Sequence, residues 1–225
     1  MHVEMYWSHS FIPDMVRPDG VVFDIGVNDG GFSRLIASRC RAVIGYEPDP
    51  RWRGRWQLPS NVTVVPAAIA ATAGRLLFHV NTERCSSMHF ADRGSESIDV
   101  DAVTLEQALA TAPDARIDLL KMDIEGEEVA VLLQAPAHLF DRVVQMTIEF
   151  HDFLDPSQAP AIREVIARLE QLGFLAVCFS FRNYGDMLFV NQKLAPISAW
   201  DRAWLLARYK YARGLGRLLK RIGGG

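Results

Sequence analysis

The chain has 225 residues, of which 49% are hydrophobic and 23% are charged, and its formal net charge at pH 7 is −3. These values are ordinary for a globular protein. They exclude a wholly disordered or fibrous chain and a protein that binds nucleic acid through its overall charge. Three cysteines without a CxxC pair argue against a disulfide framework and a zinc site, and they favour a reducing compartment. No stretch reaches about 18 apolar residues and residues 1–18 lack the pattern of a signal peptide, so we expect a cytoplasmic protein.

Apolar segments typical of strands alternate along the chain with segments of helical periodicity. In chain order, the predicted elements are a strand at 21–26, a helix at 32–40, strands at 42–46, 62–66 and 74–81, a helix at 104–110, a strand at 117–124, a helix at 127–133, a strand at 143–150, a helix at 159–172, and strands at 174–181 and 187–191. This alternation predicts an α/β fold with a mostly parallel sheet of seven strands, to which 74–81 is an addition. The last two strands are separated by about five residues, too few for a parallel crossover, so they form an antiparallel hairpin.

The C-terminal segment differs in charge from the rest of the chain. Residues 199–225 contain seven Lys or Arg and one acidic residue, a net charge of +6, whereas the remainder has 17 basic and 26 acidic residues, a net charge of −9. We therefore predict one domain over 1–196, with its core at about 21–191, and a basic amphipathic helix or tail over 197–225. Such a helix could lie on the inner face of an anionic membrane. The alternatives are a solvated tail and a helix packed on the sheet edge.

A glycine-rich loop follows the first predicted strand, with Asp24, Gly26, Asn28, Asp29 and Gly30 before the next helix. Glycine lets the backbone turn sharply and approach a ligand, and the helix N-terminus offers unpaired N–H groups, as in sheets that bind nucleotides. The pattern is not GxGxxG, and its acidic residues would repel a pyrophosphate. The loop therefore favours a cofactor with ammonium and sulfonium charges, S-adenosylmethionine, over a nicotinamide dinucleotide. An ordinary glycine-rich turn is the alternative.

Glu47 ends the second predicted strand, 21 residues after Gly26. This spacing is close to the ~20 residues expected for an acid that accepts hydrogen bonds from ribose hydroxyls. Pro48 stiffens the chain just after it. The alternative is a surface carboxylate in a turn.

Charged residues also end the strands at 117–124 and 143–150. Unpaired charges are costly inside a core, and the carboxyl edge of a parallel sheet is where ligands bind. We expect Asp123 near the site, with Lys121 or Glu125 paired elsewhere. Glu149 and His151 share one face of their strand, and histidine has the pKa range of a base at neutral pH. A structural histidine is the alternative.

Four segments together resemble the FkbM-type methyltransferases in order and spacing: DIGVNDGGFS from Asp24, GYEP at 45–48, LLKMDIEGEE at 119–128 and IEFH at 148–151. The resemblance covers about residues 21–191 and implies the Rossmann-like class I methyltransferase fold with S-adenosylmethionine as cofactor. By this resemblance, the cofactor loop consists of Asp24, Gly26, Asn28 and Gly30, and Glu47, followed by Pro48, holds the ribose. Asp123 lies near the transferred methyl group. Glu149 and His151 line the acceptor pocket. The family usually has a small residue where Val27 stands, so Val27 is expected to shift the loop.

We therefore predict an O-methyltransferase that acts on a hydroxyl group, of a sugar, a glycan or a secondary metabolite. His151 is the predicted base, oriented by Glu149, and Asp123 is the alternative base. A metal-assisted version would use Asp123 and Glu149 as oxygen ligands of Mg²⁺, although no ligand spacing requires a metal.

Two other functions are open at this point. One is a nicotinamide-dependent oxidoreductase, although none of the five tyrosines has the Lys four residues later that such enzymes commonly use. The other is a non-catalytic module that binds a nucleotide cofactor. The expected partner is a small-molecule or glycan acceptor, and no nucleic acid is expected.

Overall fold

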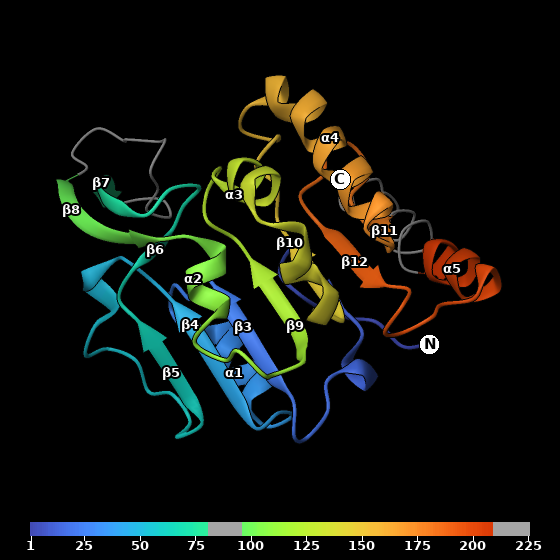
Figure 1. Cartoon of the computed structure of the whole chain (residues 1–225), viewed down its shortest axis with the longest axis horizontal. Helices are drawn as coiled ribbons and strands as arrows, with labels where there is room; N and C mark the ends of the chain where they lie inside the picture. Colours follow the sequence, from blue (N-terminus) through green and yellow to red (C-terminus); the bar gives the residue numbers. More distant parts are fainter. Residues whose placement is uncertain (81–95, 209–225) are drawn as a thin grey trace, which may run out of the picture.

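The structure is a computed structural model that describes residues 1–80 and 96–208. Its main sheet has seven strands in the order β11-β12-β10-β9-β3-β4-β5, and all are parallel except β12 (Figure 1). These strands are β3 (Val21–Ile25), β4 (Ala42–Tyr46), β5 (Val62–Val65), β9 (Ile117–Met122), β10 (Gln145–Ile148), β11 (Phe174–Cys178) and β12 (Met187–Asn191). The predicted Rossmann-like sheet with a final antiparallel hairpin is confirmed.

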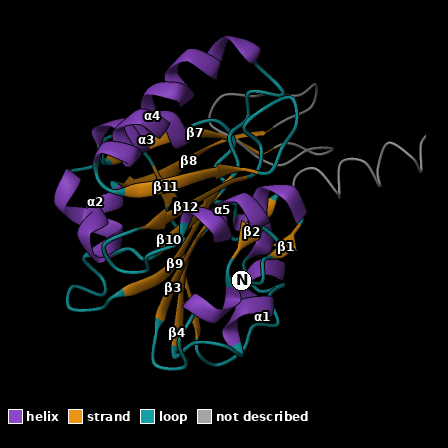
Figure 2. Cartoon of the chain, turned by 90° about the vertical axis from the view of Figure 1, so that its right-hand side faces the viewer, coloured by secondary structure: helices purple, strands orange, loops and turns teal. Residues whose placement is uncertain are grey.

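The helices cover both faces of this sheet. Figure 2 shows α2, α3 and α4 on one face and α1, α5 and the N-terminal strands on the other. The helices are α1 (Gly31–Ala37), α2 (Leu105–Leu109), α3 (Glu128–Gln134), α4 (Ala159–Gln171) and α5 (Ala199–Leu205), and short 3-10 turns lie at Pro13–Met15, Pro50–Trp52, Ala137–Arg142 and Pro156–Gln158. The predicted helices thus begin and end within a few residues of the observed ones.

Side-chain alternation along the strands builds a core on each face. In β3, Phe23 and Ile25 pack in the cluster that includes Leu132 of α3, whereas Val22 packs with Phe32 of α1. Because side chains alternate between faces with a period of two, Asp24 projects from the same face as Val22. This is the face on which the N-terminal strands lie, and it matters for the site.

Two parts of the fold were not predicted. Strands β1 (Glu4–Tyr6) and β2 (His9–Phe11) form an N-terminal hairpin, and β6 (Ala68–Ile69), β7 (Gly74–Val80) and β8 (Glu96–Val103) form a second, three-stranded sheet past the end of β5 (Figure 1). The strand predicted at 74–81 is confirmed as β7, apart from residue 81, which lies outside the described residues. The sequence of β8 alternates polar residues with Ile98, Val100 and Ala102, a strand pattern that was overlooked.

The C-terminal segment begins as a helix that packs on the domain. Ser198 caps α5, and Leu205 is fully buried in a cluster with Ile197 and Val3. Trp200 and Trp204 stay exposed at 81% and 49%. Residues 209–225, which hold most of the predicted basic helix, lie outside the described residues. Within 1–80 and 96–208, no helix is long and apolar enough to cross a membrane.

Candidate active site

The loop between β3 and α1 turns at three residues with positive φ: Gly26 (83°), Asn28 (51°) and Gly30 (82°). A Cβ atom on residue 26 would overlap the backbone carbonyl oxygen of Asp123, so only glycine fits there. The bulkier Val27 is buried against Gly45, where a Cβ atom would lie 2.5 Å from Val27 Cγ2. Gly45 therefore makes room for the Val27 side chain.

Glu47 joins this loop to the end of β4. Its Oε2 accepts a hydrogen bond from the Asn28 backbone N–H at 2.7 Å, and its Oε1 accepts one from the Asp49 N–H at 2.8 Å. Burial raises the pKa of Glu47 to about 7, although these two N–H donors lower it. Each carboxylate oxygen has a second lone pair, so Glu47 can still accept hydrogen bonds from a ligand. Pro48 follows it and is buried.

Asp24 lies beneath the loop and does not face it. Its side chain is fully buried and accepts a hydrogen bond from Ser33 Oγ at 2.6 Å. The sheet register pairs Asp24 with Lys121 of β9, whose Nζ lies 3.4 Å from Asp24 Oδ1 and also donates to the carbonyl oxygens of Ile25 and Gly26. Burial lowers the pKa of Lys121, but the charges of Asp24 and Asp123 outweigh burial and raise it. Lys121 thus links the buried Asp24 to the backbone where the loop begins. Asp24 has no exposed atom that could contact a cofactor.

The segment after β9 is folded tightly around a buried histidine. Glu125 has a φ of 58°, a strained value for a residue with a side chain. Glu128 holds the turn, since its carboxylate accepts from the N–H groups of Ile124 and Gly126 at 2.8 and 3.0 Å. His151 Nδ1 lies 3.2 Å from Glu128, and its Nε2 lies 3.2 Å from Glu125 and 3.6 Å from Asp123.

These carboxylates decide the protonation of His151. Burial lowers its pKa, but the interactions with Glu125 and Glu128 outweigh burial and raise the pKa to about 11. These contacts favour the imidazolium form of His151. Its role as base stays a prediction, and the carboxylates nearest to its ring are Glu125 and Glu128.

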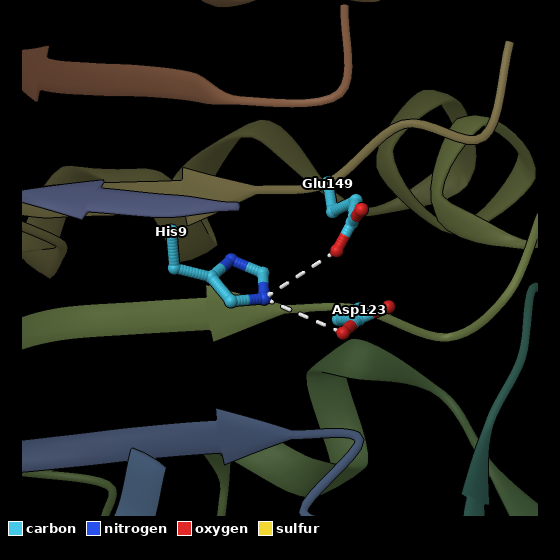
Figure 3. Close-up of side chains that lie close together, drawn as sticks. All are labelled: His9, Asp123 and Glu149. Carbon is cyan, nitrogen blue, oxygen red and sulfur yellow. Dashed lines mark hydrogen bonds and ion pairs between the residues drawn. The ribbon is translucent and has the colours of Figure 1, made fainter. Parts of the chain in front are cut away.

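A second histidine reaches the site from the N-terminal hairpin. His9 Nε2 lies 3.4 Å from Asp123 Oδ2 and 3.8 Å from Glu149 Oε2 (Figure 3). Burial lowers the pKa of His9, so its ring is neutral. Burial and the nearby charge of Asp123 raise the pKa of Glu149 to about 7. Burial acts to raise the pKa of Asp123 as well, but Lys121 and the two histidines hold it below its usual range.

The hairpin that carries His9 is anchored by buried polar contacts. Ser10 donates to Asp186 through its N–H at 3.0 Å and through its hydroxyl at 2.7 Å. The amide of Gln145 pairs with the N–H and carbonyl of Ile12, both at 2.9 Å. The hairpin is therefore fixed against β10 and β12. Sequence reasoning left its role open, and the polar run at residues 8–10 between aromatic residues was the signal available.

Most of the predicted site residues meet at one edge of the sheet. The loop residues touch Glu47 on one side and Asp123 on the other, and Asp123 lies next to both His151 and His9. Asp123, the residue predicted near the site, lies between Lys121 and the two histidines. Among the described residues, two groups could hold a metal ion with one ligand atom each: His9, Asp123 and Glu149, and Asp123, Glu125 and His151.

A parallel sheet with this strand order, a glycine-rich loop after β3 and an acid after β4 defines a Rossmann-like methyltransferase fold. The chain belongs to the FkbM methyltransferase domain family, whose domain matches residues 24–176. No curated protein matches the chain in sequence.

Several solved structures are similar in fold. An FkbM methyltransferase from Methylobacillus flagellatus is 15% identical over 77% of this chain, with a TM-score of 0.46, and the present chain spans 44% of its length. An rRNA methylase from Streptococcus thermophilus is 12% identical over 79% of this chain and 88% of its own, with a TM-score of 0.47. A methyltransferase from Streptococcus mutans, in complex with SAH, is 10% identical over 79% of this chain and 92% of its own, with a TM-score of 0.48.

Proposed function

We propose that this chain transfers a methyl group from S-adenosylmethionine to a hydroxyl oxygen of a sugar, a glycan or a secondary metabolite. The observation that carries the proposal is the meeting of three features at one sheet edge. These are the loop around Gly26, the ribose-type acid Glu47, and the carboxylates Asp123 and Glu149. The acceptor class rests on the family resemblance alone.

The residues fit the cofactor by their chemistry. Glu47 retains free lone pairs for ribose hydroxyls, and the loop has glycine at the position where a side chain would collide. When bound, S-adenosylmethionine supplies an electrophilic methyl group on a sulfonium sulfur. The excess of carboxylates at this edge would stabilise that positive charge.

On the acceptor side, the chain must position a hydroxyl and remove its proton. The His151 ring contacts the turn that carries Asp123, and the carboxylates of this turn favour its protonated form. We assign removal of the proton to Asp123 and Glu149, directly or through a bound cation. The predicted Mg²⁺ would be such a cation. Family membership favours this function over a nicotinamide oxidoreductase.

The test combines calorimetry with product analysis. We expect the chain to bind S-adenosylmethionine and to release S-adenosylhomocysteine with an acceptor from a panel of sugars, lipid-linked saccharides and phenolic metabolites. Asp123→Asn should retain cofactor binding and lose turnover by about 100-fold or more. Glu106→Gln, a change of an exposed glutamate on α2, is the matched control and should change neither.

Three outcomes would contradict the proposal. Binding of a nicotinamide dinucleotide instead of S-adenosylmethionine would support the oxidoreductase. Cofactor binding with no turnover on any acceptor would support a non-catalytic module. Methylation of RNA but of no small hydroxyl compound would move the acceptor to nucleic acid.

A further inference from the structure

The cluster of His9, Asp123 and Glu149 brings together side chains from three separate elements. His9 comes from β2, and Asp123 and Glu149 follow β9 and β10. The His9 side chain is 4% exposed, and its Nε2 points between the two carboxylates (Figure 3). One ligand atom from each residue lies within 4.8 Å of the other two.

The distances from His9 Nε2 to the two carboxylates are longer than those of typical hydrogen bonds. The two Nε2–carboxylate distances are 3.4 and 3.8 Å, whereas N–H···O hydrogen bonds are typically about 2.7–3.2 Å long. An ion held at about 2.1 Å by tetrahedral ligands keeps those ligands about 3.4 Å apart. The two distances from His9 Nε2 therefore lie within about 0.4 Å of the spacing that a shared ion requires, and the third ligand pair lies within 4.8 Å.

Charge balance at this edge also favours a bound cation. Five carboxylates lie in contact with the buried Lys121, His9 or His151, and they are Asp24, Asp123, Glu125, Glu128 and Glu149. These five carboxylates outnumber the lysine and the two histidines that contact them. A divalent cation among them would reduce their mutual repulsion.

The ligand types select the class of metal. Mg²⁺ prefers oxygen ligands, whereas imidazole suits ions such as Fe²⁺, Ni²⁺ and Zn²⁺. A buried imidazole beside two carboxylates is a mixed nitrogen and oxygen set. The cluster thus fits a transition metal better than the magnesium ion expected from Asp123 and Glu149 alone.

We propose that His9, Asp123 and Glu149 bind a divalent transition-metal ion at the acceptor end of the site. Its binding stands on the geometry above, and only its role rests on the proposed function. In that role, the ion would ease loss of the acceptor's hydroxyl proton to solvent. The methyl group then passes from the sulfonium sulfur to this oxygen, with no change of oxidation state.

Mn²⁺ is a suitable probe because its binding can be followed by electron paramagnetic resonance in the absence of cofactor and acceptor. We expect one bound Mn²⁺ per chain, with nitrogen coupling from a directly bonded imidazole. His9→Ala should weaken Mn²⁺ binding by at least about tenfold and abolish the nitrogen coupling. His138→Ala, a change of an exposed histidine that contacts Glu106, is the control and should leave both unchanged.

Folding is checked on the same variants. His9→Gln keeps a polar side chain of similar reach without an imidazole, and its binding of S-adenosylmethionine by calorimetry reports an intact fold. Mn²⁺ binding that survives in a folded His9→Gln variant, or that is absent from the unaltered chain, would overturn the site. Mn²⁺ binding without any methyl transfer would support the site and count against the proposed function alone.

Discussion

Lys121 forms a buried ion pair whose removal should destabilise the domain. Its Nζ lies 3.4 Å from the fully buried Asp24. At an effective dielectric constant of about 20, two unit charges at this distance attract by about 5 kcal/mol. Removal of one partner from a buried ion pair typically costs about 3–5 kcal/mol, because the other charge stays buried without compensation. We expect Lys121→Met to lower the free energy of unfolding by that amount.

Urea denaturation of matched variants tests this value. Asp24→Asn combined with Lys121→Met should recover at least about 2 kcal/mol, since the fully buried charge of Asp24 is then removed together with its partner. Lys193→Met is the control, because Lys193 is 64% exposed and lies 3.9 Å from Asp141. It should cost less than about 1 kcal/mol. A cost below about 1 kcal/mol for Lys121→Met, or strict additivity in the double variant, would refute the reasoning.

Three further predictions concern the cofactor loop and the C-terminal helix. Burial raises the pKa of Glu47 to about 7, so its charge is lost below that pH. Calorimetry should therefore show the affinity for S-adenosylmethionine falling about tenfold from pH 8 to pH 6. An unchanged affinity would contradict the role of Glu47. Gly26→Ala should abolish cofactor binding. Gly54 has a similar φ of 79° but no atom within 4 Å of an added Cβ, so Gly54→Ala should lose only about 1 kcal/mol of stability in thermal melts. Equal effects of the two changes would exclude the steric explanation. Replacement of the exposed Trp200 and Trp204 by Ala should reduce flotation with anionic vesicles, and equal flotation would exclude contact through this helix.

The strand order could be predicted because hydrophobic patterning and connection length leave few topologies. Segments such as β4 and β12 end where turn residues begin, and their bounds agree with the prediction. Proximity of Asp123 to the loop followed from the rule that parallel strands end at one edge.

The chemistry of the individual side chains was harder to predict. Asp24 was predicted as a cofactor residue, but its pairing with Lys121 follows from strand alternation and register and was not predicted. His151 was predicted as a base with Glu149 beside it, but the sequence did not show that Glu128, at the start of α3, lies 3.2 Å from its ring. Such pairings depend on register and loop conformation, which local periodicity does not report.

The position of His9 has a consequence for how relatives of this protein are compared. The FkbM domain match begins at residue 24, whereas His9 belongs to a hairpin that precedes it. Two members of the family could therefore agree throughout the matched region and still differ in the group that closes the acceptor end. The β1–β2 hairpin could thus change in evolution, and with it the chemistry of the pocket, while the cofactor loop and the sheet stay the same. Comparisons of family members should therefore consider this hairpin as well as the shared domain.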